Sequence, residues 1–175
     1  MYNIAIAGPL REQNELHYAI FAPICGSLQI LNLVVNNVSV PVKSFQDPIY
    51  AQIYSSCLVS KGNVIIKDTH SLDCNANLST IQQTVVFGGL IGATLNNSKT
   101  ILINTSSNAL CNYTGLKHFQ TKHADFGGLV GFSAGQVQVN KSLGILKFKT
   151  DQKVNRILVG GLVGHSRQAI SAQLS

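Results

Sequence analysis

The sequence predicts an all-β fold, a right-handed parallel β-helix (solenoid) of about five coils of ~33 residues each. A short phrase recurs as Phe87-Gly88-Gly89-Leu90-Ile91-Gly92, Phe126-Gly127-Gly128-Leu129-Val130-Gly131 and Val159-Gly160-Gly161-Leu162-Val163-Gly164. With Phe21 and Tyr54, the anchors at 21, 54, 87, 126 and 159 are spaced by 33, 33, 39 and 33 residues. Such a fixed period is typical of stacked repeats, so residues 1–175 are expected to form a single repeat domain.

Hydrophobic alternation between the anchors has a period of two, which indicates strands. The ranges 38–42, 136–140 and 146–149 all alternate apolar and polar side chains. Continuous apolar runs at 64–66 and 101–103 are typical of strands that are buried between parallel neighbours. Each coil is therefore expected to read strand, turn, strand, turn, strand, with every strand paired to its equivalents in the adjacent coils.

The repeated glycine pair predicts a coil corner. Only glycine tolerates both a positive φ and a very close backbone approach, and stacking glycine on glycine keeps the corner equally tight in each layer. The expected corner glycines are Gly88, Gly89, Gly127, Gly128, Gly160 and Gly161. The aromatic anchors Phe21, Tyr54, Phe87 and Phe126 are expected to stack as a ladder inside the core.

Two segments depart from the repeat. The six extra residues before Phe126 fall near 113–123, which we expect to project as a loop. Residues 10–18 follow Pro9 and contain good helix formers, so a short helix is expected there. The two ends of such a solenoid are open sheet edges that need a cap, and uncapped ends would favour self-association through stacked coils.

The stretch Gly127-Gly128-Leu129-Val130-Gly131-Phe132-Ser133-Ala134-Gly135-Gln136-Val137-Gln138-Val139-Asn140-Lys141-Ser142 resembles the GLUG motif. At 88–92 and 160–164 the resemblance covers mainly the glycine core. GLUG repeats occur in large extracellular bacterial proteins, including adhesin-like proteins and regions attached to immunoglobulin A peptidases, and in surface-like proteins of some protists. The resemblance implies a surface or adhesion setting and transfers no catalytic residue.

The net charge of +6 resides in the C-terminal part of the chain. Residues 1–100 carry five basic and five acidic side chains, whereas residues 101–175 carry eight and two. We expect a patch for an anionic partner, either an acidic glycan or a host or matrix surface, formed by Lys117, Lys122, Lys147, Lys149, Lys153 and Arg156. In the strand at 146–149, both lysines should point outward if Leu146 and Phe148 face the core. Nucleic acid is not expected as a partner, because no known binding module is present.

The sequence predicts no enzyme, cofactor or metal site. The aspartates are dispersed, and Asp68 and Asp73 are interpreted as turn residues. His70 beside Ser71 lacks the support of a nucleophile elbow, and is interpreted as a turn histidine. His118 and His123 are assigned to the solvated insertion, and His165 occupies the variable slot that Phe132 and Ala93 hold in other coils.

Cysteines and asparagines leave several alternatives open. Cys25 and Cys57 are expected as buried free thiols, while for Cys74 with Cys111 a disulfide and free thiols are equally compatible with the spacing. Six Asn-x-Ser/Thr triplets indicate either glycosylation or the Asn-rich turns of a solenoid. They begin at Asn37, Asn77, Asn96, Asn104, Asn112 and Asn140.

The compartment expected is extracellular or cell-surface. The chain has no apolar run long enough to cross a membrane and no secretory signal, and it opens on what reads as a strand, as a segment of a longer precursor would. The expected function is a non-enzymatic structural or adhesive segment of a secreted or surface protein. The alternatives are a carbohydrate-binding or degenerate polysaccharide-active β-helix that recognises anionic glycans, and a self-stacking assembly module.

Overall fold

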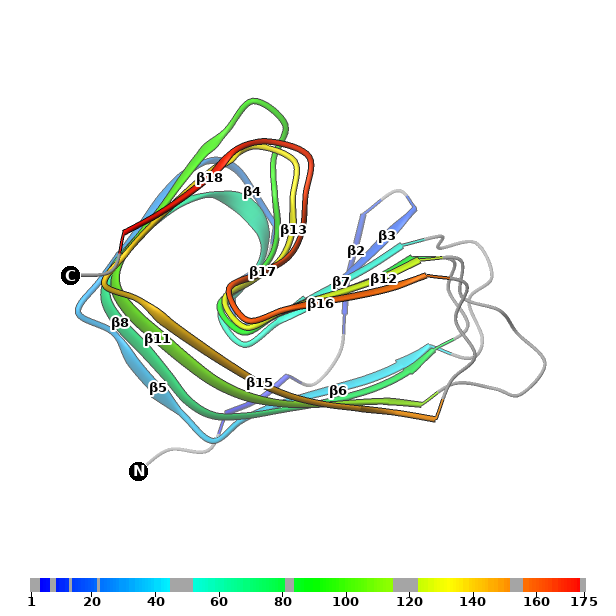
Figure 1. Cartoon of the computed structure of the whole chain (residues 1–175). Coiled ribbons are helices and arrows are strands. Elements are labelled where there is room, and N and C mark those ends of the chain that lie inside the picture. The colour runs from blue at the N-terminus through cyan, green and yellow to red at the C-terminus, as the bar shows by residue number, and fades with distance from the viewer. Residues whose placement is uncertain are drawn as a thin grey trace.

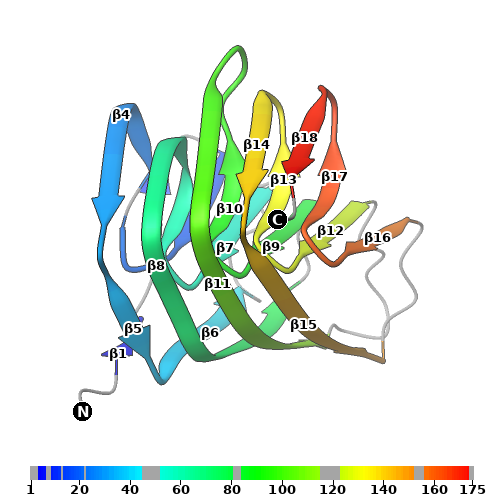
Figure 2. The ribbon, with the colours of Figure 1, turned by 60° about the vertical axis from the view of Figure 1, so that its left-hand side comes forward.

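The computed structural model describes residues 4–6, 9–12, 14–21, 23–44, 52–80, 84–114, 123–151 and 156–173. All regular structure among them is β, and it forms a parallel β-solenoid of about four turns. Figure 1 looks along the stack, and Figure 2 shows the turns side by side. The solenoid prediction is confirmed, with about four turns in place of five. Among the described residues, no helix is long and apolar enough to cross a membrane.

The strands follow one another around the stack, turn by turn. β1 (Ile4–Ala5) comes first and pairs with β6 from the preceding layer, and the N-terminal turn then holds β2 (Leu10–Glu12), β3 (Glu15–Tyr18), β4 (Ile24–Leu31), β5 (Val34–Asn36) and β6 (Val38–Ser44). The second holds β7 (Gln52–Ser56) and β8 (Val59–Thr80), and the third holds β9 (Thr84–Gly88), β10 (Ile91–Thr94) and β11 (Lys99–Thr114). The fourth holds β12 (His123–Gly127), β13 (Val130–Ser133), β14 (Gln136–Asn140) and β15 (Leu143–Thr150), followed by β16 (Ile157–Gly160), β17 (Val163–Ser166) and β18 (Ile170–Gln173).

These strands form two sheets that run the length of the stack. A six-stranded sheet has the order β16-β12-β9-β7-β3-β2, and a 12-stranded sheet includes β17-β13-β10-β8-β11-β14-β18. All pairings between described strands are parallel except the β2–β3 hairpin. This hairpin occupies residues 10–18, so the prediction of a helix there is wrong. Leu16 and Tyr18 are buried while Arg11 is exposed, and β3 extends the parallel sheet by pairing with β7.

One set of coil corners is built from residues with left-handed backbone. Asn32, Asp68, Asn104 and Lys141 all have positive φ, and the strand registers on either side stack them in successive turns. Asparagine and aspartate tolerate this conformation better than most residues. Asn104 Nδ2 donates a hydrogen bond of 2.6 Å to Asp68 Oδ1. Asp73 also has positive φ, so both aspartates occupy left-handed bends within β8.

A second set of corners, the glycine corner, bends the wall in the opposite sense. It comprises Gly88–Gly89, Gly127–Gly128 and Gly160–Gly161, together with the equivalent Ser56–Cys57. In Figure 1 the chain runs inward along β12, turns at this corner and leaves along β13, so that the outline of the coil is re-entrant. Interstrand hydrogen bonds continue through the turn, since Leu90 N and Ile91 N both donate to Leu129 O at 2.9 Å.

Close approach, and not positive φ, explains the glycines. No described glycine has a positive φ. A Cβ on Gly128 would overlap the carbonyl oxygen of Gly161 in the next turn and would lie 3.0 Å from the Cα of Gly144 on the opposite wall. A Cβ on Gly89 would likewise meet Gly128 O and the side chain of Ser107. At Gly89 and Gly128 the corner therefore touches the far wall of its own coil, leaving no space for a side chain.

In the second turn a disulfide joins these same two walls. Cys57 occupies the place of the second corner glycine, and it is bonded to Cys74 across the coil, with 6.1 Å between the Cα atoms. The expectation of a free thiol at Cys57 is therefore wrong, and Cys74 pairs with Cys57 and not with Cys111. Cys111 is a buried free thiol, and burial raises its pKa well above the usual range. The side chain of Cys25 lies outside the described part of the chain.

The aromatic ladder is only partly formed. Phe87 is in register with Phe126, but Ser55 takes the equivalent place in the second turn because only 32 residues separate it from Phe87. Tyr54 is thereby shifted to the outer face, next to Val86. Phe21 instead bridges Val59, beyond the corner. The spacing alone could not show this one-residue offset.

Inside the core the aromatic rings pack across the coil. Phe126 lies 4.4 Å from Phe148 and 5.7 Å from Tyr113, measured between ring centroids. Phe148 and Leu146 face this core while Lys147 and Lys149 are exposed, as the alternation predicted. Of the expected insertion, Tyr113 and Thr114 belong to β11 and His123 to β12. Residues 115–122 lie outside the described part of the chain.

The glycine corner supplies a matched pair of substitutions. Gly128→Ala should lower the free energy of unfolding by about 3 kcal/mol or more, because its Cβ would collide with backbone on two sides. Gly161→Ala should stay within about 1 kcal/mol of the unsubstituted protein, since no described atom lies within 4 Å of its Cβ position. Urea denaturation of both variants measures the difference. Equal losses would contradict the role of close approach at the corner.

Candidate functional site

The re-entrant corner leaves a groove of about 740 Å³ on the outside of the solenoid. Its two walls are the outer faces of the strands before and after the glycine corner, with β7, β9 and β12 on one side and β8, β10, β13 and β17 on the other. Its lining includes Tyr54, Lys61, Val86, Ala93, His123, Asp125, Phe132, Arg156, His165 and Arg167.

The register between paired strands places the residues that line the groove in two rows, each running across successive turns of the stack. On the first wall, Tyr54, Val86 and Asp125 are direct neighbours in successive strands. On the second wall, Lys61, Ala93, Phe132 and His165 follow one another in the same way. Because the alternation of each strand points these positions outward, the side chains of both rows meet in the groove. Its middle is small and apolar, and its two ends are polar.

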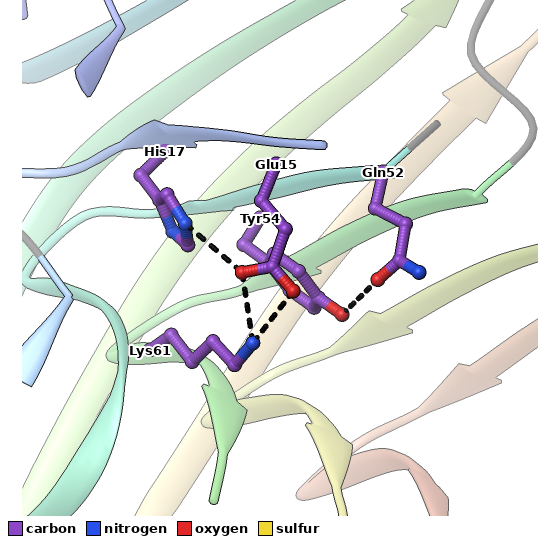
Figure 3. Close-up of polar contacts among 5 residues, drawn as sticks. All are labelled: Glu15, His17, Gln52, Tyr54 and Lys61. Carbon is purple, nitrogen blue, oxygen red and sulfur yellow. Dashed lines mark hydrogen bonds and ion pairs between the residues drawn. The ribbon is translucent and has the colours of Figure 1, made fainter. Parts of the chain in front are cut away.

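The first polar end is centred on Glu15, as Figure 3 shows. Lys61 Nζ donates to both carboxylate oxygens of Glu15, at 2.7 and 2.8 Å, and lies 4.8 Å from the centre of the Tyr54 ring. His17 Nε2 is 3.2 Å from Glu15 Oε2, and its imidazole stacks on Tyr54 with 5.6 Å between ring centroids. The Tyr54 hydroxyl donates to Gln52 Oε1. Burial, together with the nearby Glu15 charge, raises the pKa of Tyr54 above its usual range.

The second polar end, the Asp125 cluster, consists of His123, Asp125 and His165. His123 Nε2 lies 2.9 Å from Asp125 Oδ2, and His165 Nδ1 lies 3.3 Å from the same oxygen. The Asp125 side chain is only 1% exposed, whereas the histidines keep 25% and 21% of their side-chain surface. Asp125 Oδ1 is buried and has no hydrogen-bond partner among the described residues.

Aromatic neighbours fix the position of the His165 imidazole. Its ring lies 5.3 Å from Phe132 and 5.5 Å from His123, both in edge-on arrangements. The Arg167 guanidinium lies over the Phe132 ring, at 5.2 Å from its centroid. The imidazole is thus held between two walls of the groove, with its Nδ1 directed at Asp125.

Two arginines flank this end from opposite walls. Arg156 immediately precedes β16 on the first wall, and its carbonyl accepts a hydrogen bond from Ala124 N. Arg167 immediately follows β17 on the second wall, and its amide donates to Ser133 O. Both residues are exposed and line the groove. Within the described ranges, neither guanidinium forms an ion pair with a carboxylate.

The basic patch predicted from the sequence is divided by the structure. Arg156 belongs to the groove, whereas Lys147 and Lys149 lie on the outer face of β15 and do not line it. Lys117, Lys122 and Lys153 lie outside the described residues. Among the residues that are described, the cations lining the groove are therefore Arg156, Arg167 and Lys61, of which only Arg156 was predicted.

Sequence reasoning missed most of the site. His123 was assigned to a solvated loop and His165 to a variable slot, yet the fold brings both to Asp125, 40 positions before His165. The slot itself was correctly aligned, since Ala93, Phe132 and His165 are in register. A usable signal exists in the repeat: the positions that flank the Phe-Gly-Gly-Leu-Val-Gly phrase face the groove, and Asp125 and His165 are ionisable where the preceding turns have Val86 and Phe132. His70 instead contacts Ser106 Oγ at 2.8 Å in the neighbouring turn, away from this site.

The Asn-x-Ser/Thr triplets mostly occupy structural positions. Asn37 and Asn104 have positive φ at corners, and Asn112 Nδ2 donates to Asn77 Oδ1 in a ladder on the outer face. Asn96 is exposed in a turn. The interpretation as solenoid turns and ladders accounts for these positions without glycosylation, and glycosylation stays a prediction.

Comparison with family models, curated proteins and solved structures finds no match to this chain. The functional interpretation therefore rests on the groove, which has an ionisable cluster at each end and two arginines beside the Asp125 cluster.

Proposed function

We propose that this chain is a non-enzymatic adhesive module of a secreted or cell-surface protein, and that its groove binds an acidic polysaccharide. The observation that carries the proposal is the pair of exposed arginines, Arg156 and Arg167, which face the groove from opposite walls with no carboxylate partner among the described side chains. Guanidinium groups form bidentate hydrogen bonds with carboxylate and sulfate-like anions. Two of them across one groove fit an anionic group held between the walls.

The shape of the groove supports an elongated ligand. It crosses successive turns of the stack, from Lys61 to His165, and the exposed Arg156 and Arg167 stand at one end. Between the two polar ends Phe132 supplies a partly exposed nonpolar surface, packed over the buried Val86 and Ala93. Sugar rings combine an apolar face with polar edges, which matches this alternation.

We expect this protein to reside in an oxidising compartment. The Cys57–Cys74 disulfide favours a secreted or surface location, because such bonds persist where thiols are not kept reduced. The resemblance of 127–142 to GLUG repeats supports the same setting.

Binding of heparin and polygalacturonate, with dextran as the neutral comparison, tests the proposal. The Arg156→Ala/Arg167→Ala double variant should bind the acidic chain at least about tenfold more weakly, since each charge-assisted contact contributes about 1.5 kcal/mol or more. Isothermal titration at low and high salt should also show affinity falling with salt.

The matched control removes the same charge from another surface. Lys147→Ala/Lys149→Ala deletes two cations from the outer face of β15 and should leave the affinity within about twofold. A loss confined to the lysine variant would move the site to the patch predicted from sequence. No salt-dependent binding to either acidic polymer would overturn the proposal.

Self-association is a second candidate function, favoured by exposed apolar residues and unpaired strand edges in β15–β18. Val159 and Ile170 are 50% and 43% exposed, and within the described residues β15–β18 each pair with another strand on one side only. Parallel edges of this kind accept further strands. Light scattering should show a mass that rises with concentration and that Val159→Lys suppresses. A constant monomer mass at all concentrations would exclude this role.

A further inference from the structure

We infer that His123, Asp125 and His165 form a binding site for a divalent transition-metal ion of the Zn²⁺ type. One ligand atom from each side chain lies within 4.8 Å of the others. The ligand–ligand distances in a tetrahedral zinc site, with bonds of about 2.0–2.2 Å, measure roughly 3.3–3.6 Å. The 2.9 and 3.3 Å separations of the two imidazole nitrogens from Asp125 Oδ2 are close to those distances.

The buried carboxylate is the second, independent observation. Asp125 is 1% exposed, and its Oδ1 has no donor within the described part of the chain. An incompletely partnered anion in a buried position is unfavourable, whereas a bound cation would compensate its charge. A metal ion between the three side chains accounts for the convergence of both nitrogens and for the burial of the charge.

The donor set selects the class of metal. Two imidazole nitrogens and one carboxylate oxygen suit Zn²⁺, Co²⁺ and related first-row ions, whereas Ca²⁺ and Mg²⁺ prefer all-oxygen sites. Three protein ligands leave at least one coordination position, and the partial exposure of both histidines directs it into the groove. The rigid backbone of β12 and β17, fixed on either side of the glycine corner, keeps the ligands close together without the metal.

The site does not depend on glycan binding. A coordinated ion would add a further group for an anionic ligand at the arginine end of the groove, but metal affinity is measured without any glycan. Either proposal can therefore fail while the other stands.

Cobalt titration of the tag-free, EDTA-stripped full chain tests the inference. The expected result is one Co²⁺ per chain, with the intense visible d–d bands of a four- or five-coordinate ion. One equivalent of Zn²⁺ should displace the Co²⁺ and abolish the bands. His165→Ala, at a half-buried position, should weaken binding at least about tenfold and should abolish the thermal stabilisation that Zn²⁺ gives the unsubstituted protein.

Two further variants keep the result interpretable. Asp125→Asn should also lose the bands, and its melting temperature without metal shows whether it is folded. His70→Ala removes a histidine at a different place in the solenoid and should bind Co²⁺ as the unsubstituted chain does. Weak absorption of the kind that octahedral Co²⁺ gives, or a Co²⁺ affinity that His165→Ala leaves unchanged, would contradict the proposed site.

Discussion

The contact between the glycine corner and the opposite wall of the coil is the constraint on which the rest of the structure depends. Gly89 packs against Ser107 and Gly128 against Gly144, with no space for a Cβ at either corner position, and in the second turn the Cys57–Cys74 disulfide joins the same walls covalently. The disulfide closes a loop with a sequence separation of 17. By limiting the conformations of the unfolded chain, a disulfide across a loop of this length stabilises a fold by about 3 kcal/mol. The corner is held because each of its layers donates backbone hydrogen bonds to the next.

The groove is the direct consequence of this contact. An outward corner would have spread its two strands apart on the surface, whereas an inward corner turns their outer faces toward each other. Residues that ordinarily would be separate surface side chains, such as Asp125 on β12 and His165 on β17, therefore meet and are partly withdrawn from solvent. The same geometry sets Arg156 and Arg167 on opposite sides of one opening. The Asp125 cluster needs no loop, because the regular strands β12 and β17 position all three side chains, and sites on strands are held more rigidly than sites on loops.

Much of the fold follows from local pattern, and much of the site does not. The strands, the stacked glycines and the left-handed Asp68 and Asn104 are local features, which period and residue type express directly. The sense of the corner is different, because glycine permits a bend either way and only packing against Ser107 and Gly144 decides it. The position of Tyr54 depended on a one-residue offset between turns, and the cysteine pairing depended on the corner reaching the far wall. The β2–β3 hairpin replaced a helix because pairing with β7 outweighs helix propensity.

Disulfide mapping tests the re-entrant corner most directly. Proteolysis of the folded, alkylated protein followed by mass spectrometry should recover a peptide that links Cys57 to Cys74. Cys111 should be alkylated only after unfolding, because it is buried and its raised pKa keeps it as the less reactive thiol. An open coil without the inward corner would hold Cys57 away from Cys74 and would leave Cys74 free to pair with Cys111, near which it lies in the adjacent strand. A Cys74–Cys111 linkage, or Cys57 alkylated in the folded protein, would contradict the account.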